Sequence, residues 1–147
     1  MKNNIFLALI MCCSTQLLAN DRQVFIKNYL NDFANGKPLS HYFIEQPTFI
    51  FGPHTHTPKS ASEASQFIKT IRTKLAKINY QQSRIDTAVQ HVQIDQYTLA
   101  TYTLTRFKQD GSELDKICST YGTLNTANGL KIVSWQPSDP TSDQKCE

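Results

Sequence analysis

Two histidines in the stretch "FGPHTHTPKS" are the first residues whose types and spacing could do chemistry. His54 and His56 stand two positions apart, and alternate residues of an extended chain point to the same side. Two such imidazoles could share a metal ion, although a catalytic zinc site takes three protein ligands. His41 and Glu45 are the nearest further donors, and no spacing brings them close. A His-x-His metal-binding protein is therefore one hypothesis, while the expected cofactor is none.

Cys118 and Cys146 are the second candidate pair. In an oxidising compartment, an even pair of cysteines is typical of one disulfide, and the alternative is two free thiols. A disulfide explains Cys118 better than a reactive thiolate does. No serine is flanked by glycines in the manner of a nucleophile elbow, so nucleophilic catalysis is not indicated.

The chain begins with "MKNNIFLALIMCCSTQLLAN", which has the layout of a secretory signal peptide. A lysine precedes an apolar run too short to span a bilayer, and Ala19 offers a small residue for cleavage. A lipoprotein anchored at Cys12 or Cys13 is an alternative, but the bulky Met11 before them argues against it. We expect residues 1–19 to be removed, leaving an exported protein, periplasmic or secreted, with no membrane contact.

The length and charge of the chain exclude two further classes of protein, those with two domains and those that bind nucleic acids. Removing 19 of the 147 residues leaves 128, enough for one domain with a core and too few for two. Loss of Lys2 lowers the formal net charge from +3 to +2. The cations between Lys69 and Lys77 are interpreted as the exposed face of a helix rather than as a basic stripe that binds a nucleic acid. We expect no nucleic-acid partner.

Two amphipathic helices are predicted in the first half. In "NDRQVFIKNYLNDFANG" the apolar residues share one stripe, and Gly36 follows as a stop. In "SASEASQFIKTIRTKLAKI" the pair Ser60 and Glu63 makes a capping box, which predicts a helix over about 61–79. Between them, "KPLSHYF" indicates a helical turn and "PTFIFG" a brief buried strand.

The second half, from Tyr80 onward, is typical of antiparallel strands rich in Thr, Tyr, Val and Ile. The pair Asp110-Gly111 favours a two-residue type I′ turn, which needs positive φ at both positions. The predicted class is α+β. The domain is expected over residues 20–137, followed by an irregular C-terminal tail at 138–147.

Four stretches in this order carry a family resemblance: "VFIKNYLNDFANG", "HYFIEQPTFIF", "SASEASQFIKTI" and "FKQDGSEL…TYGTL…GLKIVSW". Over about residues 21–137 the chain resembles the nuclear transport factor 2-like superfamily, specifically its SnoaL-like members. The resemblance implies a cone: a curved antiparallel sheet wrapped around two main N-terminal helices, with a pocket. It also implies a candidate homodimer through the sheet. None of the stretches is a catalytic signature, so the resemblance predicts fold rather than function.

The superfamily includes ketosteroid isomerase, which permits a residue-level comparison. Tyr29 falls where the resemblance places that enzyme's oxyanion-hole tyrosine. The position of its carboxylate base is Phe51 or Gly52 here. An isomerase of that type is excluded, because no group would accept the proton.

The turns predict which residues share a face of the sheet. A loop at 110–111 pairs Arg106 with Asp115, and a loop at "NTANG" pairs Tyr121 with Val133. The concave face then carries Ala100, Tyr102, Leu104, Ile117, Tyr121, Val133 and Trp135, and the outer face carries Thr101, Thr103, Thr105, Lys116, Cys118 and Thr120. The tail is long enough to bring Cys146 back to Cys118.

A tight turn near Asp95 would pair His91 with Ala100 and point the imidazole inward. The candidate pocket is then lined by Tyr29, His91, Tyr102, Tyr121 and Trp135. Such a pocket combines a titratable group with aromatic walls. The alternative is that these aromatic side chains simply fill the core.

The predicted function is binding of a small apolar ligand or a partner protein, without catalysis. A second hypothesis is a cofactor-independent lyase or isomerase, with His91 as base and Tyr102 or Tyr121 as hydrogen-bond donor. The enzyme hypothesis requires that His91 faces an open cavity, with a tyrosine hydroxyl in reach.

Overall fold

The computed structural model describes residues 20–146, so the predicted signal peptide and the lipoprotein alternative lie outside the described residues. The first element is a helix at residues 20–34, called here the N-terminal helix. It ends in a Schellman motif, in which the Gly36 amide donates to the Phe33 carbonyl at 3.1 Å and the Lys37 amide to the Asp32 carbonyl at 3.0 Å. Gly36 adopts the φ of +67° that this ending needs. The predicted stop is confirmed.

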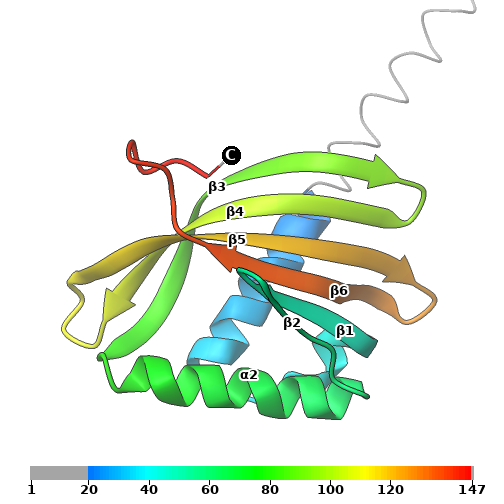
Figure 1. Cartoon of the computed structure of the whole chain (residues 1–147), viewed down its shortest axis with the longest axis horizontal. Coiled ribbons are helices and arrows are strands. Elements are labelled where there is room, and N and C mark those ends of the chain that lie inside the picture. Colours follow the sequence, from blue (N-terminus) through cyan, green and yellow to red (C-terminus); the bar gives the residue numbers. More distant parts are fainter. Residues whose placement is uncertain (1–19, 147) are drawn as a thin grey trace, which may run out of the picture.

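The remaining elements form one sheet and one further helix. They are the short 3₁₀ helix η1 (Ser40–Tyr42), β1 (Phe43–Phe51), β2 (His54–His56), α2 (Ala61–Ala76), β3 (Tyr80–Ile94), β4 (Tyr97–Lys108), β5 (Glu113–Thr126) and β6 (Gly129–Ser138). The sheet has the order β2-β1-β6-β5-β4-β3. All neighbours are antiparallel except β1 and β6, which are parallel. In Figure 1 the sheet arches in front of the N-terminal helix, and α2 runs along its lower margin.

The start of α2 is capped largely as predicted. The Ser60 hydroxyl accepts the amide hydrogen of Glu63 at 3.2 Å, while the Glu63 carboxylate accepts from the amide of Lys59 at 2.8 Å. Glu45 of β1 accepts the Ala61 amide at 3.0 Å. These acceptors satisfy amides that have no partner inside the helix. The helix ends at Ala76, short of the predicted 79, because residues 77–79 form a turn into β3.

The hairpin of β4 and β5 has the predicted register at Arg106, but its turn differs from the predicted one. Arg106 pairs with Asp115, as predicted. The turn is not a two-residue type I′ turn: the Lys108 amide donates to the Ser112 carbonyl, and Gly111 alone has positive φ, at +82°. This is a three-residue loop with glycine in the left-handed position. A β-bulge next to Arg106 then compensates for the extra loop residue.

The hairpin of β5 and β6 differs from the prediction by two positions. Tyr121 pairs with Trp135, not with Val133. The loop is shorter than "NTANG", since Thr126 pairs with Gly129, and a bulge follows between Gly122 and Thr123. Trp135 remains on the face that meets the helices, whereas Val133 does not: a Cβ added at Gly122, on the outer face, would lie 3.1 Å from the Val133 side chain. The prediction for Val133 is therefore wrong.

Both helices pack against the same face of the sheet, the concave face. Tyr29 of the N-terminal helix lies edge-on to Tyr121 of β5, with ring centroids 5.9 Å apart. Phe67 of α2 stacks on Phe49 of β1 at 5.3 Å. The predicted α+β class, with a curved sheet around two helices, is confirmed. Neither helix of the described chain is long and apolar enough to cross a membrane.

Candidate ligand-binding cavity

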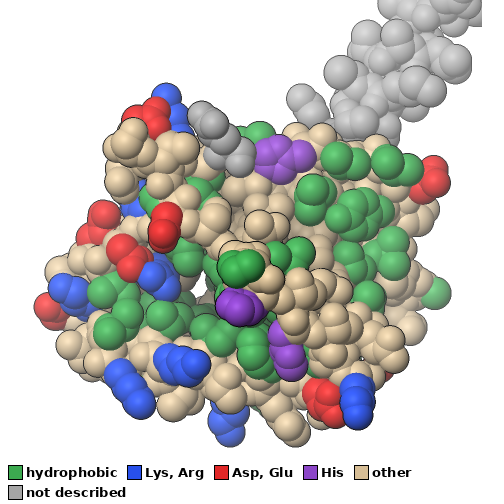
Figure 2. Space-filling model, viewed as in Figure 1, with side chains coloured by type: hydrophobic (Ala, Val, Ile, Leu, Met, Phe, Trp, Pro, Cys, Tyr) green, Lys and Arg blue, Asp and Glu red, His purple; other side chains and the backbone are tan. Residues whose placement is uncertain are grey.

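A cavity of about 210 Å³ lies between the concave face and the two helices. Its lining is Tyr29, Leu30, Phe33, Phe51, Ile71, Leu75, Tyr80, Ser83, Leu104, Arg106, Ile117, Ser119, Tyr121, Trp135 and Pro137. Figure 2 shows a hollow bordered by hydrophobic side chains, in the region between α2 and the end of β6. No carboxylate or imidazole is among these described lining side chains. The described lining is therefore mostly apolar.

Aromatic rings hold the wall formed by β1, β5 and β6. Trp135 is stacked over Tyr121, with ring centroids 6.4 Å apart and planes at 14°. Phe51 meets the Trp135 ring edge-on at 5.5 Å. Edge-on and stacked contacts of this kind orient large rings. Phe51, which stands where the isomerase comparison required a carboxylate base, is thus an apolar wall.

The polar groups of the lining mostly have partners inside the protein. The Tyr80 and Ser83 hydroxyls lie 2.9 Å apart. The Trp135 indole donates to the Ser119 hydroxyl at 3.4 Å. The Arg106 guanidinium forms a two-pronged ion pair with Asp115. The charge of Arg106 is therefore already balanced by a carboxylate of the protein.

Burial keeps the tyrosines of this region in their neutral form. It raises the pKa of Tyr29 and of Tyr121 well above that of a free phenol, and a hydrogen bond with Ser119 offsets only part of the effect at Tyr121. The pKa of Tyr80 is raised for the same reason, despite the nearby positive charge of Arg106. At neutral pH these hydroxyls are hydrogen-bond donors rather than anions.

Three of the five residues predicted for the pocket line the cavity: Tyr29, Tyr121 and Trp135. Tyr102 lies on the concave face and packs against Tyr121 at 5.8 Å, but it is buried in the core beside the cavity. The prediction omitted Ile71 and Leu75 of α2. Their places in the apolar stripe of that helix were visible in the sequence, but nothing in the stripe separates a cavity wall from a filled core.

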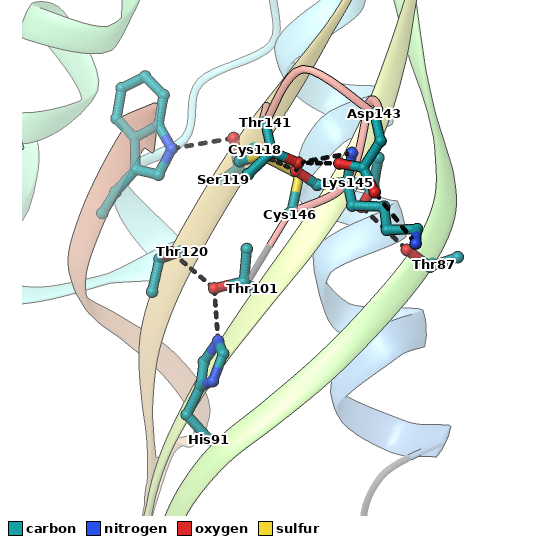
Figure 3. Close-up of a disulfide and its surroundings, with 12 residues drawn as sticks. Thr87, His91, Thr101, Cys118, Ser119, Thr120, Thr141, Asp143, Lys145 and Cys146 are labelled. Carbon is teal, nitrogen blue, oxygen red and sulfur yellow. Dashed lines mark hydrogen bonds and ion pairs between the residues drawn. A yellow bond between two sulfur atoms is a disulfide. The ribbon is translucent and has the colours of Figure 1, made fainter. Parts of the chain in front are cut away.

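His91 lies on the outer face, so the prediction that it points into the pocket is wrong. The turn at Asp95 is as tight as predicted, but Gln90 rather than His91 pairs with Ala100. His91 is the extra residue of a β-bulge, which turns its side chain to the other face. Its Nε2 lies 2.7 Å from the Thr101 hydroxyl (Figure 3). His91 therefore cannot act as the base of a lyase that works in this cavity.

His54 and His56 occupy β2, the edge strand beside β1, and both are exposed. His56 packs on Phe67 of α2, with ring centroids 4.3 Å apart. Among residues 20–146, no group of three His, Cys, Asp or Glu side chains lies close enough to hold a metal ion. The structure thus brings no third ligand to this pair.

Cys118 and Cys146 form a disulfide, with Cα atoms 5.4 Å apart. Figure 3 shows the tail returning to the outer face of β5, where Cys118 lies. The tail has no regular secondary structure, but it is ordered around Thr141, whose amide donates to the Lys145 carbonyl at 2.9 Å. The strand before it, β6, ends at Ser138, one residue beyond the predicted boundary.

The geometry of sheet, helices and cavity agrees with the comparisons to known proteins. The family model described as "NTF2-like protein (DUF6841)" matches residues 20–140. The chain belongs to this NTF2-like family. Among curated proteins, none matches the chain.

Solved structures show the same fold at low sequence identity. An NTF2-like protein with a cystatin-like fold from Novosphingobium aromaticivorans has a TM-score of 0.64 at 15% identity, covering 93% of this chain and 90% of that one. An NTF2-like superfamily protein from Salmonella enterica has a TM-score of 0.63 at 18% identity, covering 87% and 94%. A putative calcium/calmodulin-dependent protein kinase II association domain from Xanthomonas campestris has a TM-score of 0.61 at 12% identity, covering 84% of this chain and 89% of that one. Proteins described so differently share the fold, so function has to be argued from the cavity.

Proposed function

We propose that this NTF2-like chain is an exported protein that binds a small apolar ligand in its cavity without catalysing a reaction. The observation that carries the proposal is the lining. Its described side chains are mostly aliphatic and aromatic, and the one cation among them, Arg106, is paired with Asp115. Apolar pockets with a few polar groups are the usual form of small-molecule sites. A volume of about 210 Å³ lies below the range for drug-sized ligands, which favours a smaller guest.

Two further observations support parts of this proposal. A disulfide is compatible with an oxidising compartment outside the cytoplasm, as the predicted signal peptide requires. The non-catalytic role is favoured by the lining, where the described side chains offer no carboxylate or imidazole as a general base. A homodimer through the outer face of the sheet stays a prediction.

The chain has a single tryptophan, Trp135, and it lines the cavity, so its fluorescence should report occupancy. We expect saturable changes in emission when the purified protein is titrated with substituted benzenes and straight-chain alcohols of graded size. Ile71→Phe should weaken this binding several-fold, because the larger ring fills space that the ligand needs.

Ile78→Phe is the matched control, since Ile78 is 48% exposed just beyond α2 and does not line the cavity. It should bind like the wild type. Circular dichroism would verify that both variants fold. If no compound in the series changes the emission of Trp135, or if Ile71→Phe binds as well as the wild type, the proposed function is wrong.

A further inference from the structure

A second pocket, of about 220 Å³, lies where the end of the N-terminal helix meets the middle of α2. Its lining comes from Phe33 in the last turn of that helix, from the chain at 36–39, and from one face of α2 within residues 65–72. In Figure 1 the lower end of the N-terminal helix reaches α2, where these segments meet. Phe33 is the one described residue that this pocket shares with the apolar cavity. A ligand bound here would therefore not occupy the apolar cavity.

Positive charge gathers at this second pocket. Three cations line it, Lys37, Lys69 and Arg72, whereas no described lining residue is acidic. Lys37 is paired with Asp32 at 2.8 Å. Lys69 and Arg72 take part in none of the ion pairs between described residues, and they lie three positions apart on the same face of α2. Two of the three positive charges thus lack a carboxylate within the described chain.

The guanidinium of Arg72 is fixed in place by the backbone. Its Nε and Nη2 donate to the Ala34 carbonyl at 3.1 and 2.9 Å, at the end of the N-terminal helix. A Cβ added at Gly36 would lie 3.1 Å from the Cζ and Nη1 of Arg72, so the glycine backbone lies close against the guanidinium. A guanidinium has five N–H donors, and these two bonds leave three, including a parallel pair on Nη1 and Nη2. A carboxylate accepts such a pair with both of its oxygens.

The second pocket also has an apolar wall. Phe33 and Leu39 are buried core residues that line it, together with Pro38. A short alkyl chain placed against this wall would be removed from water, which favours binding. An inorganic anion has no such group and would gain nothing from the wall.

We infer that the second pocket binds a small carboxylate that carries a short alkyl chain. The carboxylate accepts from the guanidinium of Arg72 and from the ammonium group of Lys69, and the chain packs on Phe33 and Leu39. This site goes beyond the proposed function, because its ligand is charged and binds outside the apolar cavity.

Three probes separate the parts of this inference: butyrate has a charge and a chain, 1-butanol has the chain without the charge, and inorganic phosphate has charge without a chain. Binding would be followed at constant ionic strength by NMR on isotope-labelled protein, through the backbone amide signals of Gly36 and Leu39, which both line the second pocket. The indole signal of Trp135 reports the apolar cavity separately. Butyrate should shift the two amide signals saturably and bind more tightly than either other probe.

Lys69→Gln should weaken butyrate binding about two- to fivefold, the range of one exposed ion pair. Lys74→Gln is the matched control, because it removes the same charge from an exposed position of α2 that does not line the pocket. It should bind butyrate like the wild type. Arg72→Lys keeps the charge but loses the parallel pair of donors, so it should weaken binding more than Lys69→Gln does. Circular dichroism would verify that all three variants fold.

The outcomes are distinct. If butyrate causes no saturable shift at Gly36 and Leu39, or if Lys69→Gln and Lys74→Gln weaken its binding equally, the inference is overturned. Tighter binding of phosphate than of butyrate would overturn the carboxylate class, and equal binding of 1-butanol would overturn the role of the charge. None of these results bears on the proposed function, which is read from Trp135.

Discussion

Asp32 shows how one carboxylate joins three segments at the end of the N-terminal helix. It accepts from Lys37 Nζ at 2.8 Å and from the Tyr42 hydroxyl at 2.8 Å. Tyr42 in turn lies edge-on to Tyr29, which lines the cavity, with ring centroids 5.4 Å apart. The hydrogen bonds from Lys37 and then Tyr42 lower the pKa of Asp32. The carboxylate therefore stabilises the folded state only when it is ionised.

We expect Asp32→Asn to be less stable than the wild type near neutral pH, and the difference to vanish in acid. Because the folded pKa lies below the unfolded one, the contribution of Asp32 is complete above the unfolded value and is lost as the pH falls through the folded value. Urea denaturation of both proteins from about pH 7 down to about pH 2.5 would measure this.

Asp139→Asn is a suitable control, since Asp139 is exposed in the tail and makes no hydrogen bond to the described residues. Its stability should follow that of the wild type throughout. A constant difference between Asp32→Asn and the wild type at every pH would contradict the role given to the charge.

At the scale of elements, bulges decide which residues reach the cavity. Strand β3 departs from regular pairing with β4 at three points, and one of them turns His91 outward. A bulge adds local twist and bends the strand, which lets the sheet wrap around the helices. Bulges also blunt an edge strand against unwanted pairing, and β3 is an edge of this sheet.

The cap of α2 offers a test at this scale. Ser60→Ala should lower the free energy of unfolding by about 1 kcal/mol, because the amide of Glu63 loses its acceptor. Ser62→Ala, an exposed serine two residues on, should be neutral or slightly stabilising, since alanine favours helices. Chemical denaturation monitored by circular dichroism would compare the two. Equal effects would mean that the Ser60 cap contributes nothing measurable.

For the whole molecule, the disulfide joins the tail to the middle of the sheet. The bond closes a loop over 28 positions, from Cys118 to Cys146, which contains Tyr121, Trp135 and Pro137 of the cavity wall. A cross-link of this length restricts the unfolded chain and so favours the folded state.

Reduction should therefore lower the free energy of unfolding by about 2–4 kcal/mol. Cys146→Ser should show the same loss without a reductant, and adding one should change it no further. Urea denaturation with and without reductant would measure both, alongside mass spectrometry for free thiols. Two free thiols in the purified, unreduced protein would contradict the bond.

Much of this molecule could be predicted from local sequence. The stop at Gly36, the cap at Ser60, the apolar stripes and the class of the fold all follow from patterns a few residues long. Such patterns act through neighbouring backbone groups, so they are legible without the rest of the chain.

Only the tertiary structure decided the rest. Bulges at His91 and beyond Gly122 depend on how the sheet curves over the helices, and each shifts the residues farther from the hairpin turn to new partners. The cavity is likewise a property of the packing, because the same stripe residues, such as Ile71, could line a space or fill it. Residue types show that a face is apolar, whereas the fit of two helices into a curved sheet decides whether room is left for a ligand.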